Sequence, residues 1–175
     1  MVKDGSGVGA MTGVSAAYLA KEGFTGAPAV LMDNQDLDEI WADLGANWRI
    51  FEQYFKPYPV CRWAQPSVQA VLNLRERHQL QAADVERIEV TTFHEAIRLA
   101  TRHPETTEQA QYSTAFPAAS ALVYGSLGAE EISTQSFANP EVNRLSGSMV
   151  FSESEQFNNA FPANRFASVT LQLKD

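Results

Sequence analysis

The residues best placed to do chemistry lie in segment 55–62, which reads Phe-Lys-Pro-Tyr-Pro-Val-Cys-Arg. Lys56 stands between aromatic residues and a Pro-Tyr-Pro turn, where the prolines restrict the backbone and could aim the long cationic side chain. A lysine held in this way can bind a carboxylate or take part in proton transfer. The alternative is an ordinary surface lysine whose stem lies beside Tyr54 and Phe55. The sequence leaves both interpretations open.

Cys61, in the same segment, is the single cysteine of the chain. No internal disulfide can therefore form, and a reducing compartment is favoured. Free cysteine is among the most buried residue types, so the pattern predicts a small core residue rather than a nucleophile. A cysteine nucleophile stays the alternative, because the neighbouring Arg62 would favour the thiolate if the thiol were exposed.

The histidines and the N-terminal glycines give weaker signals. The chain has three histidines: His78, His94 and His103. None is spaced from a Cys, Asp or Glu in a way that suggests a metal site, so we expect surface or structural roles and no bound metal. Three alternating glycines superficially suggest a phosphate loop: Gly5, Gly7 and Gly9. Their spacing is not that of a P-loop, and no strand precedes them.

Composition excludes several classes of partner. The net charge is −8, and the 13 basic residues are scattered, so no basic surface for nucleic acid is expected. No apolar run approaches the roughly 20 residues that a membrane span requires. The first residues lack the apolar stretch of a secretory signal, and we expect a cytoplasmic protein. A hydrophobic fraction of 45% supports a folded core.

The apolar spacing predicts the elements that position these residues. Helices are expected around 11–20 with a stop at Gly23, over 37–44, from Pro66 to about 77, over 116–124 and over 140–145. Strands are expected over 48–52, 85–93, 148–151 and 166–173, and a loop over 102–111. Asp36 and Glu39 form a possible capping box for the second helix. Helices and strands mix without a regular βαβ alternation, which predicts an α+β fold with a small antiparallel-type sheet and packed helices.

Four stretches, in order, resemble the MmgE/PrpD family. They are Gly-Val-Ser-Ala-Ala to Gly-Phe-Thr-Gly in 13–26, Phe-Lys-Pro-Tyr-Pro in 55–59, Ile-Glu-Val in 88–90 and Ala-Gln-Tyr-Ser in 110–113, which leads into Ala118 and Ala119. The resemblance implies a cofactor-independent lyase, similar to 2-methylcitrate dehydratase and cis-aconitate decarboxylase, that acts on a small di- or tricarboxylic acid. It implies a homodimer in which a large helical domain and a smaller α+β lid enclose the active site.

On this resemblance, residues 1–47 are a remnant of the helical domain and residues 48–175 form the lid domain. Lys56 and Lys3 correspond to the catalytic lysines of the family, with Lys3 placed to within a residue. The substrate-binding residues implied are Tyr58, Cys61, Arg62 and Ser113.

Two positions depart from the family pattern. Gln65 stands where a histidine usually precedes the helix-opening proline, and Phe116 replaces a tyrosine and so removes a hydroxyl. Most of the helical domain is also missing, so we expect these residues alone to be inactive. The alternative is a stand-alone, non-catalytic module that binds a small molecule or dimerises. A third hypothesis is an enzyme that depends on Cys61.

Overall fold

The structure is a computed structural model that describes residues 5–174. Contacts divide the chain into two compact units, Met1–Tyr54 and Phe55–Asp175. The N-terminal unit contains helices α1 (Gly5–Lys21), α2 (Val30–Asp33) and α3 (Asp38–Trp41) and the 3-10 helices η1 (Gln35–Leu37) and η2 (Arg49–Glu52). Of its described residues, 5–54, none is buried.

Two predictions in this unit are wrong. The strand expected over 48–52 is wrong: η2 forms instead, and Arg49 pairs with Glu52 at 2.8 Å and with Asp43 at 2.6 Å. The expected capping box is also wrong, because Asn34 Oδ1 accepts the backbone N–H of Asp36 at 3.0 Å and so caps η1. The alternating glycines lie in the first turns of α1, which excludes a phosphate loop there.

The C-terminal unit combines six helices with a three-stranded sheet, and the α+β prediction is confirmed. The helices are α4 (Gln65–His78), α5 (His94–Ile97), α6 (Thr107–Tyr112), α7 (Ala115–Tyr124), α8 (Pro140–Ser148) and α9 (Glu155–Ala160), with short 3-10 helices η3 (Ala82–Asp84) and η4 (Ser136–Ala138). The strands are β1 (Val85–Thr92), β2 (Val150–Glu153) and β3 (Ala167–Leu173). The helices predicted from Pro66, over 116–124 and over 140–145, and the strands over 85–93, 148–151 and 166–173, are confirmed to within a few residues.

The sheet has the order β2-β1-β3 and is mixed. The expected antiparallel pairing holds between β1 and β3, where Val90 lies opposite Val169. β1 and β2 run parallel instead, with Glu89 opposite Val150. A parallel neighbour requires a crossover connection, and the helices between β1 and β2 provide one. A register shift between Val85 and Arg87 breaks the period of two at the start of β1.

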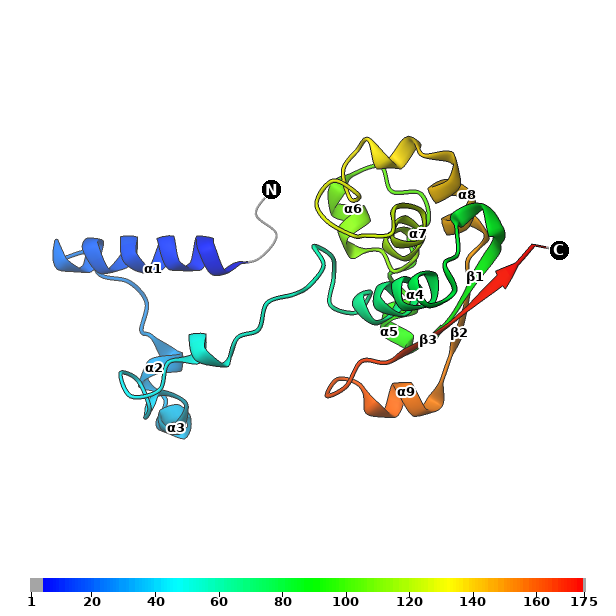
Figure 1. The fold of residues 1–175 in the computed structure, drawn as a ribbon. Helices are drawn as coiled ribbons and strands as arrows, with labels where there is room; N and C mark the ends of the chain where they lie inside the picture. The colour runs from blue at the N-terminus through cyan, green and yellow to red at the C-terminus, as the bar shows by residue number, and fades with distance from the viewer. Residues whose placement is uncertain (1–4, 175) are drawn as a thin grey trace. The chain divides into compact units, whose positions relative to one another are not determined.

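The core lies between one face of the sheet and three helices. α4 packs on β3 and α7, and α8 packs on β1 and α7, so these helices lie to one side of the sheet (Figure 1). α7 is the most buried element, and its residues 115–122 are all buried. The predicted loop over 102–111 is wrong in its second half, where α6 begins after Thr106, whose hydroxyl accepts the backbone N–H of Gln109.

Candidate functional site

The Pro-Tyr-Pro segment forms a loop that hydrogen bonds hold to the C-terminal unit at Tyr58 and just after Pro59. Val60 is buried in the core, and the backbone N–H of Cys61 donates to the carbonyl of Gln111 at 2.7 Å. From the first turn of α4, Gln65 Nε2 donates to the carbonyls of Tyr58 and Val60, each at 3.3 Å. The prolines and these hydrogen bonds together fix the path of the loop.

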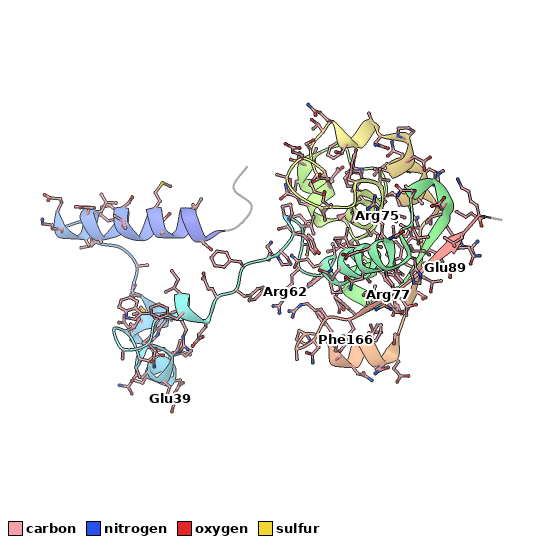
Figure 2. The ribbon with its side chains drawn as sticks, in the orientation of Figure 1. Glu39, Arg62, Arg75, Arg77, Glu89 and Phe166 are labelled. Carbon is pink, nitrogen blue, oxygen red and sulfur yellow. The ribbon has the colours of Figure 1, made fainter. Side chains whose placement is uncertain are left out.

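A hollow of about 360 Å³ opens between this loop, the start of α4 and segment 163–165, which precedes β3. Its polar lining consists of Tyr58, Arg62, Gln65, Gln69, Asn164 and Arg165. Arg62 lies where the chain turns into α4 (Figure 2). The lining contains two arginines and no Asp, Glu or His, so the hollow is locally positive in a chain of net charge −8. A hollow of this charge favours an anionic ligand.

The Tyr58 phenol belongs to the wall of the hollow. Its hydroxyl donates to Gln69 Oε1 at 2.6 Å, and its ring packs against the core. Partial burial raises the pKa of Tyr58 above its ordinary value, because the phenolate loses solvation. The phenol therefore stays protonated near neutral pH and can act as a hydrogen-bond donor.

Arg165 is a site residue that the sequence patterns did not indicate. Its guanidinium lies 5.7 Å from the ring centre of Phe161, and that ring stacks on Phe93 at 4.9 Å. Trp63 meets Phe161 edge to face at 5.7 Å. Three aromatic rings, brought together from distant segments, therefore hold this arginine at the hollow.

Lys56 lies just outside the residues that line the hollow. Its side chain is exposed, and Nζ donates to the Val60 carbonyl at 3.4 Å, the same oxygen that Gln65 binds. The ammonium thus contacts the end of the loop at Val60, whereas Pro57 and Tyr58 line the hollow. Lys3, the other lysine predicted to be catalytic, lies outside the described residues.

Comparison with protein families assigns this domain to a known family. Residues 58–175 match the MmgE/PrpD C-terminal domain. The chain belongs to the MmgE/PrpD family. The sequence has no significant match among curated proteins.

The MmgE/PrpD match begins at Tyr58 and includes every polar residue of the hollow. Tyr58 and Arg62, both predicted to bind substrate, meet in this hollow. Cys61 is partly buried and points its backbone N–H at α6, and it does not line the hollow. Ser113 lies apart, fully buried, where its hydroxyl donates to the Thr101 carbonyl.

Ser113 has a clear role in the fold of this MmgE/PrpD domain. The same hydroxyl accepts the backbone N–H of Phe116 at 3.0 Å and so satisfies a donor at the start of α7. Phe116 is itself fully buried and meets Phe137 edge to face at 5.4 Å. A hydroxyl at position 116 would therefore lie in the core, and its loss does not change the hollow.

Over residues 5–174, the structure shows no cluster of three or more His, Cys, Asp and Glu side chains that could hold a metal ion. No helix in this range combines the length and apolar character needed to cross a bilayer.

Proposed function

We propose that this chain forms one wall of the active site of a cofactor-independent MmgE/PrpD lyase. The reaction is dehydratase-like, and the substrate is a small di- or tricarboxylic acid. Family membership and one observation carry the proposal: the loop after Lys56 bounds a positive hollow that is lined by Tyr58 and Arg62. The planar guanidinium of an arginine matches the geometry of a carboxylate, which it can bind through two parallel hydrogen bonds.

Each proposed residue has a separate task. Lys56 binds a substrate carboxylate or exchanges a proton with the reacting carbon or hydroxyl, and Lys3 assists it as the second catalytic lysine. Tyr58 donates a hydrogen bond from a phenol that stays neutral, and Arg62 supplies a planar set of donors for a carboxylate. Cys61 and Ser113 also stay in the predicted set of substrate-binding residues, although neither lines the hollow.

The same chemistry implies that these residues do not suffice for turnover. Loss of water requires a base beside the acidic C–H and an acid beside the leaving hydroxyl. The described lining of the hollow offers cations, amides and a phenol, and none of them is an effective base near neutral pH. We therefore propose that the chain binds carboxylates but needs a second wall, the helical domain of the family, for catalysis.

Calorimetric titration of the 175-residue chain with citrate tests the binding step. We expect Lys56→Met to weaken binding about tenfold or more, since a hydrogen bond to a charged group contributes about 1.5–3 kcal/mol. Lys56→Arg should retain part of the affinity. Lys21→Met, at the end of α1, is the matched control and should bind as the wild type does. Equal affinity of Lys56→Met and wild type would remove Lys56 from the site.

A second candidate is a non-catalytic module that binds a small carboxylate without turnover. The lack of a base in the hollow favours it. Adding a separately expressed helical domain of the family separates the two. Appearance of an unsaturated acid, followed by its ultraviolet absorbance, supports the lyase. Citrate binding that is never followed by product supports the module. A cysteine-dependent enzyme would instead lose all activity on alkylation of Cys61.

We also propose that the protein is a cytoplasmic homodimer. The single cysteine suits a reducing compartment. α1 exposes Met11, Val14 and Tyr18, each more than half accessible, and an apolar helix face of this kind is normally covered. Sedimentation equilibrium should give twice the mass of the chain, and a monomer at micromolar concentration would contradict the dimer.

A further inference from the structure

The guanidinium of Arg165, in the C-terminal unit, has a buried nitrogen without a hydrogen-bond partner among the described residues. This nitrogen is Nε. Arg165 also forms no ion pair with any carboxylate of residues 5–174. A buried donor without an acceptor costs free energy, and the cost is larger for a charged group.

The contact with Phe161 explains how Arg165 is held and leaves its donors unused. The interaction of the guanidinium with the ring is electrostatic and dispersive, and it satisfies no N–H group. Phe161 is itself fixed between Phe93 and Trp63. An arginine that is oriented in advance by aromatic packing loses little conformational freedom when it binds a ligand.

The surroundings of Arg165 favour an anion. It lines the same hollow as Arg62, and the lining contributes no carboxylate to pair with Arg165. The first residues of α4, Gln65 and Pro66, also border the hollow, and the start of a helix adds partial positive charge. The amides of Gln69 and Asn164 supply further polar contacts for an oxygen-rich ligand.

We propose that Arg165 is an anion-binding residue that takes one carboxylate group of a ligand bound in the hollow that Arg62 also lines. The class of ligand rests on the proposed function, and the assignment of Arg165 rests on its buried donor and the charge of the hollow. A ligand with two or more carboxylates can then engage Arg165 with one group and leave another for a second donor of the same lining. Arg165 thus selects for polycarboxylates over monocarboxylates.

Calorimetric titration of the full chain with citrate, acetate and the neutral trimethyl ester of citrate tests this assignment. We expect Arg165→Gln to weaken citrate binding roughly tenfold or more. Arg165→Lys should fall between Gln and wild type, because lysine keeps the charge but lacks the fork of donors. Acetate should bind far more weakly than citrate, and the ester should not bind. Arg98→Gln, which changes an exposed arginine beside a separate small hollow, is the matched control and should bind as the wild type does.

The outcomes separate this inference from the proposed function. If Lys56→Met weakens citrate binding and neither Arg165 variant does, the role of Arg165 is wrong and the proposed function stands. If the Arg165 variants weaken binding and Lys56→Met does not, Arg165 is supported and Lys56 loses its proposed role. Binding of the neutral ester as tight as that of citrate, inorganic phosphate binding tighter than citrate, or no citrate binding at all would each overturn the carboxylate site. Thermal unfolding by circular dichroism checks that Arg165→Gln is folded, and Arg165→Lys carries the test if it is not.

Discussion

The phenol of Tyr58 donates a 2.6 Å hydrogen bond to Oε1 of Gln69, which joins the Pro-Tyr-Pro loop to the second turn of α4. Gln69 Nε2 in turn donates to Asn73 Oδ1 at 2.8 Å, and Gln65 binds the carbonyl of Tyr58. These three α4 residues are spaced by four and therefore lie along one face of the helix. The helix face thus sets the position of the loop that bounds the hollow.

Tyr58→Phe should remove a phenol whose pKa is raised above its ordinary value. Burial raises the pKa of Tyr58, so its phenolate forms above the ordinary value of about 10. Because the unfolded-state phenol ionises first, the stability that Tyr58 contributes is present below about pH 10 and is lost as the pH rises further. Absorbance titration should show that Tyr58→Phe loses the component of highest pH, and that Tyr18→Phe, in exposed α1, retains it. Loss of an earlier component in Tyr58→Phe would contradict the assignment.

The sequence predicted the elements of the C-terminal unit whose signals are local. Pro66 sits at the start of α4, and the small apolar run of α7 ends at Gly125, which adopts a positive φ of 75°. Pairing partners carry no such local signal, so the parallel alignment of β1 with β2 was not predicted. In segment 48–52, the alternating pattern predicted a strand, but the structure has the 3-10 helix η2, in which the exposed Arg49 pairs with Glu52.

In the candidate site too, the residues with a local sequence signal were predicted and those without one were not. Tyr58 and Arg62 were indicated by a motif that is contiguous in the sequence, and both line the hollow. Arg165 reaches the hollow from a segment about a hundred residues further on, and Phe93 joins the aromatic cluster from the end of β1. No spacing rule connects such positions, because only the tertiary fold brings them together.

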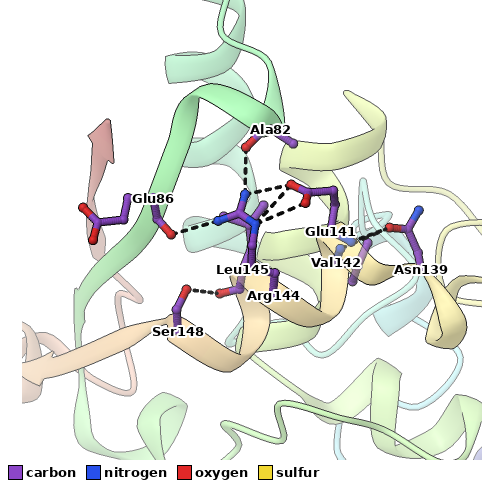
Figure 3. A network of polar contacts seen from close by, with 8 residues as sticks. All are labelled: Ala82, Glu86, Asn139, Glu141, Val142, Arg144, Leu145 and Ser148. Carbon is purple, nitrogen blue, oxygen red and sulfur yellow. Dashed lines mark hydrogen bonds and ion pairs between the residues drawn. The ribbon is translucent and has the colours of Figure 1, made fainter. Parts of the chain in front are cut away.

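Arg144 ties α8 to the beginning of β1, and Arg144→Met should destabilise the unit by about 1–3 kcal/mol. Its guanidinium donates to the carbonyls of Ala82 and Glu86, each at 3.0 Å, and pairs with Glu141 at 2.7 Å (Figure 3). Methionine keeps the apolar stem and removes all of these bonds. Urea denaturation measures the change. The matched control is Arg77→Met, on the exposed face of α4, which should shift stability by no more than about 0.5 kcal/mol. Equal effects of the two substitutions would show that the network contributes nothing.

Acid should loosen the contact between the ends of β1 and β2. Glu153 Oε1 lies 2.7 Å from His94 Nδ1, and Asn158 Nδ2 donates to Oε2 at 3.3 Å. The hydrogen bond with His94 is the main cause that lowers the pKa of Glu153, and the bond from Asn158 adds to it. A carboxyl whose pKa is lowered on folding contributes stability that is complete above its unfolded value, about 4.3, and is lost as the pH falls through the folded value. The free energy of unfolding should therefore decline below about pH 4.3 in wild type.

Two variants test whether Glu153 causes this decline in stability. Glu153→Gln cannot gain or lose a proton, so its stability should depend less steeply on pH in that range, whereas Glu76→Gln, exposed on α4, should follow the wild type. Urea unfolding at a series of pH values measures the slopes. Identical slopes for Glu153→Gln and wild type would show that the His94 contact does not persist in solution.

Gly125→Ala should be the most damaging of the glycine substitutions, for two separate reasons. Gly125 ends α7 with φ +75°, a left-handed conformation that costs an L-residue with a side chain roughly 1–2 kcal/mol. An added Cβ would also lie 2.8 Å from Cζ of Arg75, whose Nε donates to the Leu122 carbonyl at 3.0 Å. We expect a total loss of about 2–4 kcal/mol in the free energy of unfolding, measured by urea denaturation. Gly147→Ala is the control, because the nearest atoms, in the ring of His103, lie at an ordinary 3.5 Å and its φ is not positive.

A double-mutant cycle with Arg75→Ala separates the two causes. Removing the guanidinium relieves the clash but not the backbone strain, so the second substitution should cost less in the Arg75→Ala background than in wild type. The remaining cost is that of the left-handed conformation alone. Strict additivity would show that the arginine swings away freely and that the bond to Leu122 does not hold it. In that case the cost of Gly125→Ala would be entirely a property of the backbone, and α4 and α7 would be joined at this point by apolar packing alone.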